Sequence, residues 1–249
     1  MADFEYSHDK QTLGTDWKSR VVHKDDLKIT AYHEAGHTLV NIFTENTHPL
    51  HKVTIVSKGR TGGHTAFVPE RDSTHWSKAE MLAQMDTAMG GRAAEEIILG
   101  KDKITGGASS DLEGATNIAK LYVKKLGMSE KFGLRVVGDR QEEIEMSEST
   151  KNLMDTEVTR LLNDSYKNAT NILKTHRKEL DLLADALLKY ETLDADDVKA
   201  ILEGNSKALG TRNTLNSTSK IQFTNNSQVN NLPSGKPEDI SPGNGGVLL

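Results

Sequence analysis

The sequence TAYHEAGHTLV, residues 30–40, sets two histidines four positions apart, His33 and His37, with Glu34 directly after the first. Apolar residues between Asp26 and Phe43 predict that this stretch lies in a helix. Residues four apart project from one face of a helix, so the two imidazoles could bind one metal ion. The rest of the chain must then supply a third ligand.

The five residues from His33 to His37 match the pattern H-E-x-x-H. A zinc ion held by both imidazoles would lower the pKa of a water molecule towards ~7, and Glu34 is placed to accept its proton as general base. Gly36 costs about 1 kcal/mol relative to alanine inside a helix, which suggests that another element approaches closely there. A pentapeptide of this form also arises by chance, so the motif alone leaves an ordinary helix as an equal alternative.

Composition limits the kind of site and partner. The chain has no cysteine, so a metal must be held by imidazole and carboxylate groups. The 31 basic and 36 acidic residues give a net charge of −5, which favours neither nucleic acid nor an anionic membrane as partner. No stretch approaches the ~18–20 apolar residues of a membrane-spanning helix, and the first ten residues lack the apolar core of a secretion signal. We therefore expect no nucleic-acid partner and no transmembrane segment in this chain.

Two short strands and a helix are predicted after the histidine motif. β-Branched residues in HKVTIVSK, 51–58, favour a strand, and TAFVP favours a second strand that Pro69 ends. A helix is predicted from Trp76 to Leu99. Ser77 and Glu80 have the spacing of a capping box at its start.

The second half of the chain has a helical periodicity. A helix is predicted after Ser109 or Ser110, one of which is expected to be the N-cap, with Gly127 as its stop. Residues 149–189 predict one long helix followed by another. Asp194 is expected to cap a last helix, ADDVKAILEG.

The predicted fold class is mainly α (α+β), with a small β-sheet inserted after the first helix. Residues 1–22 are expected to be a helical or irregular lead-in. Residues 205–249 are rich in Asn, Ser, Thr, Gly and Pro and have hardly any apolar periodicity, which predicts a disordered tail.

Spacing leaves the third ligand open. A metzincin would carry glycine and histidine where this chain has Val40 and Phe43, which excludes that class. A thermolysin-like site would use a glutamate on a following helix, and Glu95 and Glu96 fit by spacing. The alternative is Asp111, in the first turn of a helix, where the helix dipole favours an acidic residue in any case.

Six segments occur in this order along the chain: TAYHEAGH, HKVTIVSKGR, MGGRAAEEIILG, GGASSDLEGATNIAK, MSEKFG and LLKYETLDADDV. Together they resemble the peptidase domain of the FtsH family of membrane-bound AAA zinc metalloproteases, peptidase family M41. Within that family the chain is most similar to the mitochondrial i-AAA protease. The resemblance runs from about residue 3 to residue 204.

The resemblance implies that His33, His37 and Asp111 bind one Zn²⁺ per chain and that Glu34 is the catalytic base. An aspartate oxygen is a reasonable ligand for zinc. The two glutamates of MGGRAAEEIILG would then lie on the helix surface or support the ligands.

The family also assigns a role to the strand that begins near Gly63, His64 and Thr65. In relatives this edge strand lies beside the active site and can pair with an extended substrate backbone; the alternative is a plain sheet edge. Gly62 and Gly106 stand where relatives usually carry larger residues, so we expect more flexible loops at both positions.

The resemblance divides the chain into a remnant of the ATPase small subdomain or linker at 1–22, a zinc metallopeptidase domain at 23–204 and a tail at 205–249. It implies hydrolysis of peptide bonds in unfolded or misfolded (membrane) proteins, in the family coupled to ATP-dependent unfolding for mitochondrial protein quality control. No G-x-x-x-x-G-K-[ST] stretch occurs in the chain, so ATP would act only through an ATPase module outside it.

The implied assembly is a homo-hexamer or a co-assembly with a full-length AAA protease. The implied location is the mitochondrial inner membrane, on the intermembrane-space side. The alternative function is a catalytically non-autonomous fragment that assembles with or regulates a full-length AAA protease. Because the ATPase motif and the membrane anchor of the family do not occur in this sequence, we expect either a fragment of a longer product or a protein reduced to its protease part.

Overall fold

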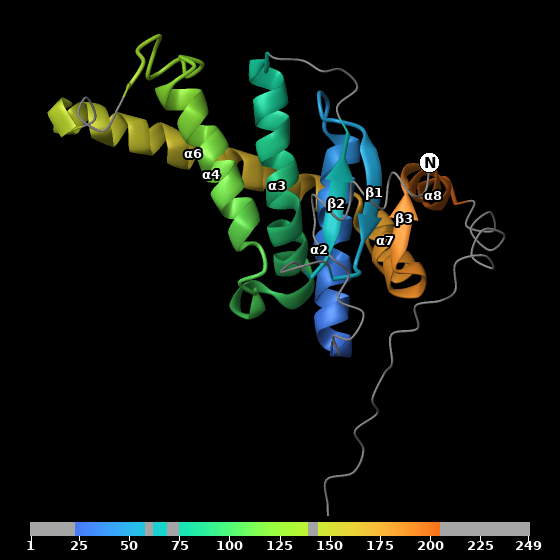
Figure 1. Ribbon diagram of the computed structural model, residues 1–249. Helices are drawn as coiled ribbons and strands as arrows, with labels where there is room; N and C mark the ends of the chain where they lie inside the picture. The colour runs from blue at the N-terminus through green and yellow to red at the C-terminus, as the bar shows by residue number, and fades with distance from the viewer. Residues whose placement is uncertain (1–22, 58–61, 69–74, 139–143, 205–249) are drawn as a thin grey trace, which may run out of the picture.

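The structure is a computed structural model that describes residues 23–57, 62–68, 75–138 and 144–204 (Figure 1). The expectations for residues 1–22 and for the tail at 205–249 lie outside these ranges. The elements are α2 Lys24–Phe43, β1 Leu50–Thr54, β2 His64–Phe67, α3 Lys78–Leu99, η1 Lys101–Lys103, α4 Ser109–Lys124, α6 Glu148–Thr175, α7 Arg177–Tyr190, β3 Thr192–Asp194 and α8 Ala195–Leu202.

The predicted fold class, mainly helical with a small sheet, is confirmed. The sheet is antiparallel and has the order β2-β1-β3, so β2 lies at one edge. Val53 of β1 pairs with Thr65 on one side and with Leu193 on the other. The inserted hairpin is therefore completed by β3, a strand from near the C-terminal end of the domain that the sequence did not predict.

Helix α3 is the central helix of the domain. It packs against α2, α4 and α6, while α7 packs against the other side of α2. In Figure 1 the sheet lies over α2, and α6 runs across behind α3 and α4. The largest fully buried side chains come from α2, α3, α6, α7 and β3: Leu39, Met81, Met85, Leu173, Leu180, Leu183, Leu187 and Leu193.

The close approach expected at Gly36 is made by α3. A Cβ atom on Gly36 would lie 2.5 Å from the carbonyl oxygen of Gly90 and 2.6 Å from Cβ of Ala94. A Cβ on Gly90 would lie 2.7 Å from the carbonyl oxygen of Gly36. The two helices are thus in backbone contact at one point, and only glycine fits on either side of it.

Two predicted helix caps are confirmed, and so is the division of residues 149–189 into two helices. Ser77 and Glu80 form a capping box at the start of α3. Asp194 forms another with Asp197 at the start of α8. The periodic stretch 149–189 forms α6 and α7, which are separated only at His176.

The predicted N-cap of α4 is wrong. Ala108 is the N-cap, and both Ser109 and Ser110 lie inside the helix. The amide of Ser109 donates to the carbonyl of Gly106 at 3.2 Å, so the helical turn begins earlier than a serine cap would allow. Gly127 follows the end of α4 with φ of +58°, a left-handed conformation that glycine adopts without strain.

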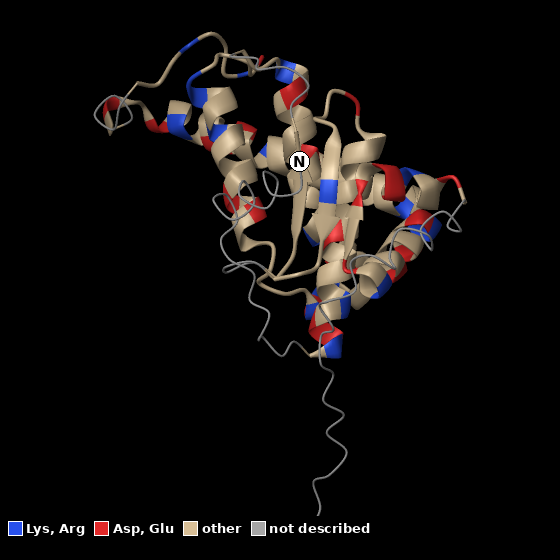
Figure 2. Ribbon diagram, turned by 45° about the vertical axis from the view of Figure 1, so that its right-hand side comes forward, with Lys and Arg blue, Asp and Glu red and all other residues tan. Residues whose placement is uncertain are grey.

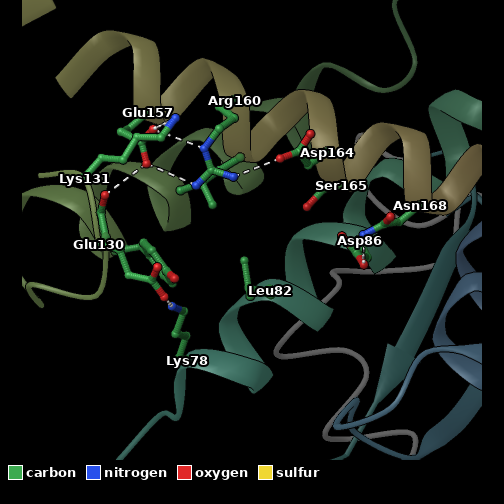
Figure 3. A pocket seen from close by; sticks show the side chains of 13 residues that line it. Lys78, Leu82, Asp86, Glu130, Lys131, Glu157, Arg160, Asp164, Ser165 and Asn168 are labelled. Carbon is green, nitrogen blue, oxygen red and sulfur yellow. Dashed lines mark hydrogen bonds and ion pairs between the residues drawn. The ribbon is translucent and has the colours of Figure 1, made fainter. Parts of the chain in front are cut away.

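A polar cavity of about 510 Å³ lies between α3, α6 and the segment that follows α4 (Figure 3). The buried carboxylate of Glu157 accepts two hydrogen bonds from Arg160 at 3.1 Å and one from Ser129 at 3.0 Å. Nζ of Lys131 lies 3.2 Å from the same carboxylate. This network fixes the segment after α4 against α6.

Surface charge is mixed in the described domain. Figure 2 shows basic and acidic residues interspersed along the helices in this view. Among the described residues, no helix combines the length and apolar character required to cross a membrane.

Candidate metal centre

His33, His37 and Asp111 lie together. Each side chain offers one possible ligand atom, and these three atoms lie within 4.8 Å of one another. Nε2 of His33 is 3.0 Å from Nε2 of His37 and 3.1 Å from Oδ2 of Asp111. The structure thus brings the two histidines of α2 to the acid in the first turn of α4, 78 residues away in sequence from the first of them.

A hydrogen bond at Nδ1 orients each imidazole. Nδ1 of His37 donates to the carbonyl oxygen of Thr87 at 2.8 Å. Nδ1 of His33 lies 2.9 Å from Oε1 of Glu95, a carboxylate that can only accept when ionised. With both Nδ1 atoms protonated, the lone pair of each neutral imidazole is on Nε2, which faces the other histidine and Asp111.

Glu95 and Glu96 do not join the cluster. The Glu95 side chain is 1 % exposed, and its Oε2 accepts from the amide and the hydroxyl of Thr105, both at 2.9 Å. Its other oxygen contacts the nitrogen of His33 that points away from Asp111. Glu96 instead accepts a hydrogen bond from the hydroxyl of Tyr166. The spacing along the chain allowed either glutamate as the third ligand. The geometry therefore supports neither of them in that role.

The electrostatics of the cluster favour a positive charge at its centre. Burial opposes the charged imidazolium of His33, but the carboxylates of Asp111 and Glu95 outweigh it and raise the pKa of His33 to about 10. Burial raises the pKa of Asp111, but hydrogen bonds and charge interactions with His33 and His37 hold it well below its usual range. Once the proton of His33 Nε2 is displaced, two imidazole lone pairs and a carboxylate converge in this way, and such a donor set suits Zn²⁺.

Helix α3 leaves room for the cluster at Gly91. A Cβ atom on Gly91 would lie 2.5 Å from Cε1 and Nε2 of His33 and 2.6 Å from Nε2 of His37. Any side chain at this position would therefore occupy the space in front of the two nitrogens. The glycine keeps the convergence point of the three donor groups accessible.

The side chain of Glu34, a residue of α2, contacts the edge strand β2. It is 6 % exposed, and its Oε2 accepts a hydrogen bond of 2.6 Å from the hydroxyl of Thr65. A Cβ atom on Gly63 would lie 2.8 Å from Cγ and Oε1 of Glu34. His64 pairs with Thr54 of β1 in the hairpin. Gly63 and Thr65, two of the three residues expected on a substrate strand, thus lie beside the expected base.

Gly62 and Gly106, which stand where relatives usually carry larger residues, differ in the space around them. A Cβ atom on Gly106 would meet nothing within 4 Å, whereas one on Gly62 would lie 3.3 Å from Oγ1 of Thr30. The expected flexibility of both loops stays a prediction.

Some groups that hold the cluster residues in place could not be predicted from the sequence. The carbonyl of Thr87 and the side chain of Thr105 hold His37 and Glu95 in place. Gly90 and Gly91 belong to a segment that carries the family resemblance. Their role in packing becomes visible only in the structure, because it depends on the contact between α2 and α3.

Comparisons with known proteins agree on one family. The model of peptidase family M41 matches residues 20–201. The chain is 50 % identical over 210 residues to the ATP-dependent zinc metalloprotease YME1L of Drosophila melanogaster, covering 81 % of this chain and 28 % of that protein. It is 46 % identical over 204 residues to ATP-dependent zinc metalloprotease YME1L1 of Homo sapiens, covering 82 % and 26 %.

A plant protein is also similar. ATP-dependent zinc metalloprotease FTSH 11, chloroplastic/mitochondrial, of Arabidopsis thaliana is 44 % identical over 198 residues, covering 80 % of this chain and 24 % of that protein. The chain therefore spans less than a third of the length of these curated relatives.

Proposed function

The chain belongs to peptidase family M41, and we propose that it is a zinc metalloendopeptidase domain that hydrolyses unfolded or misfolded polypeptides. The observation that carries the proposal is the convergence of His33, His37 and Asp111 at a point that Gly91 leaves open. The names of the relatives, which describe ATP-dependent zinc metalloproteases, support zinc as the metal.

In the proposed mechanism the three cluster residues hold one Zn²⁺ per chain. When bound, this ion lowers the pKa of a water molecule and polarises the peptide carbonyl. Glu34 accepts the proton of the water that attacks the carbonyl carbon, and the C–N bond breaks. Glu34 then passes the proton to the leaving amine, so that it serves first as base and then as acid.

The substrate is proposed to bind as an extended backbone along the outer edge of β2. Among the described residues, β1 is the only strand that pairs with β2, which leaves the other edge open. Backbone groups of Gly63, His64 and Thr65 would then make the contacts. Pairing through the backbone reads an unfolded polypeptide with little regard for its side chains.

The proposed setting is that of the family. We place a remnant of the ATPase module or linker at 1–22, the peptidase domain at 23–204 and a tail at 205–249. The domain would act in a homo-hexamer or with a full-length AAA protease, with ATP used only by the ATPase module. The proposed location is the mitochondrial inner membrane, with the catalytic part facing the intermembrane space. The name of the plant relative, which includes "mitochondrial", supports the organelle.

Cleavage of an unfolded protein tests the proposal. The zinc-loaded chain is expected to cleave casein, and Glu34→Gln is expected to lower the rate by ~10²–10⁴-fold while it retains the metal. Cleavage by both proteins at the same rate would contradict the role of Glu34. Metal bound by both and cleavage by neither would support the alternative, a chain that only assembles with or regulates a full-length AAA protease.

A further inference from the structure

The geometry points to Thr65 as a positioning residue for Glu34. The hydroxyl of Thr65 holds one carboxylate oxygen of the base, so the position of the base for proton transfer depends on the register of strand β2. This inference rests on the proposed peptidase function for its catalytic consequence. The contact itself is a property of the fold.

The hydrogen bond between these two residues has a defined direction. Oγ1 of Thr65 lies 2.6 Å from Oε2 of Glu34. An ionised carboxylate has no proton to donate, so the threonine hydroxyl is the donor. A hydrogen bond to a charged group is about twice as strong as one between neutral groups. In the part of the chain that the structure describes, Oε1 of Glu34 has no hydrogen-bond partner.

Gly63, the residue before strand β2, also restricts the remainder of the Glu34 side chain. The backbone at Gly63 lies so close that a Cβ there would come within 2.8 Å of Cγ and Oε1. Gly63 and Thr65 are two residues apart, so they face the same side of the strand. The contact at Gly63 limits sideways movement of the carboxylate, and the hydroxyl of Thr65 decides which oxygen is occupied. Oε1 is therefore the oxygen that is left to accept a proton.

The pairing of β2 with β1 places the hydroxyl. Thr65 is the partner of Val53, and a shift of one residue would turn the threonine to the opposite face of the sheet. A peptide that pairs with the outer edge of β2 would use the backbone of the same strand. The hydrogen bond thus connects the strand that would hold the substrate to the group that would take the proton. Loss of a contact that orients the base is expected to affect kcat rather than KM.

Two substitutions at Thr65 isolate the hydroxyl. Thr65→Val keeps the branched shape and suits a strand, whereas Thr65→Ser keeps the hydroxyl. In the zinc-loaded full chain, Thr65→Val is expected to lower kcat by about tenfold or more, with KM changed by less than about twofold, because general acid–base catalysis contributes ~10²–10⁴-fold in total. Thr65→Ser is expected to recover most of kcat. The control is Thr156→Val, at an exposed threonine of α6 whose hydroxyl donates to the carbonyl of Asn152 in its own helix; it is expected to keep the wild-type kcat.

Zinc content is measured for every variant, so that metal loss is separated from misplacement of the base. A kcat of Thr65→Val equal to that of the wild type would overturn the inference. So would a Thr65→Ser variant as slow as Thr65→Val.

A structural readout decides the inference without activity. In crystal structures of the zinc-loaded chain, the Glu34 carboxylate is expected to leave its present orientation or lose order in Thr65→Val and to keep it in Thr65→Ser. An unchanged carboxylate in Thr65→Val would overturn the inference. Absence of cleavage by the wild-type chain would count against the proposed peptidase function instead, and the crystallographic comparison would still decide the role of Thr65.

Discussion

Nδ1 of His33 lies 2.9 Å from Oε1 of Glu95, and the Glu95 side chain is almost fully withdrawn from solvent. The opposite carboxylate oxygen is held by the amide and the hydroxyl of Thr105. A carboxylate that accepts the second N–H of a metal-binding imidazole fixes the ring and makes its other nitrogen a better donor. Helix α3 and the segment after it therefore hold His33, the proposed zinc ligand on α2, in place.

Glu95→Gln is expected to weaken zinc binding by about 10–100-fold, the usual effect of changing the partner of a metal-binding histidine. Competition with a chromophoric chelator measures the affinity. Glu113→Gln, at an exposed position of α4, is the matched control and is expected to bind zinc like the wild type. Equal affinity for the Glu95 variant and the control would contradict a supporting role for Glu95.

The contact between α2 and α3 makes Gly36 sensitive to any added side chain. Gly36→Ala would place a methyl group 2.5 Å from the backbone oxygen of Gly90, which cannot move without shifting a helix. We expect a loss of about 1–3 kcal/mol in the free energy of unfolding, or more, measured by urea denaturation. Gly114→Ala on α4 is the control, because a Cβ there meets nothing within 4 Å. It should stabilise the protein by about 0.5–1 kcal/mol.

The ion-pair network at the polar cavity predicts a pH dependence of stability. Hydrogen bonds from Arg160 outweigh burial and, with Lys131 and Ser129, lower the pKa of Glu157 to about 2. Since the pKa is depressed in the folded state, the stabilisation is complete above about pH 5 and is lost as the pH falls towards 2. Glu157→Gln is therefore expected to cost about 1–3 kcal/mol at pH 7 and progressively less in acid.

Unfolding curves of the wild type and Glu157→Gln between pH 3 and pH 7 measure this difference. Asp155→Asn, an exposed neighbour on α6, controls for the change of charge. A cost of Glu157→Gln that stays constant across the whole range would show that the carboxylate is not held in its ionised form by this network.

Local signals made much of the fold predictable. Ser77 could be predicted as a cap because a capping box joins residues only three apart, and Asp194 because it directly precedes the last helical segment. Strand β3 was not predicted, since its three residues have no pattern of their own and form a strand only by pairing with β1. The start of α4 was misassigned because the turn at Gly106 begins the helix before either serine could cap it.

The candidate site, like the fold, could be predicted from the sequence only in part. The spacing of His33 and His37 is a property of one helix, so their shared face could be predicted. The choice between Glu95 and Asp111 depends on how α3 packs against α2 and α4, and the spacing of residues along the chain does not contain this information. Asp111 was predicted as the third ligand from the family resemblance instead. The Thr87 carbonyl could not be predicted, since every residue carries such a group.

The zinc affinity of Asp111→Ala, compared with the wild-type chain by titration calorimetry, tests the three-residue zinc site most directly. The wild-type chain is expected to bind one Zn²⁺. Asp111→Ala is expected to bind it much more weakly, because the carboxylate is the only anionic group among the three residues of the cluster. Full-strength binding by Asp111→Ala would contradict the proposed zinc site.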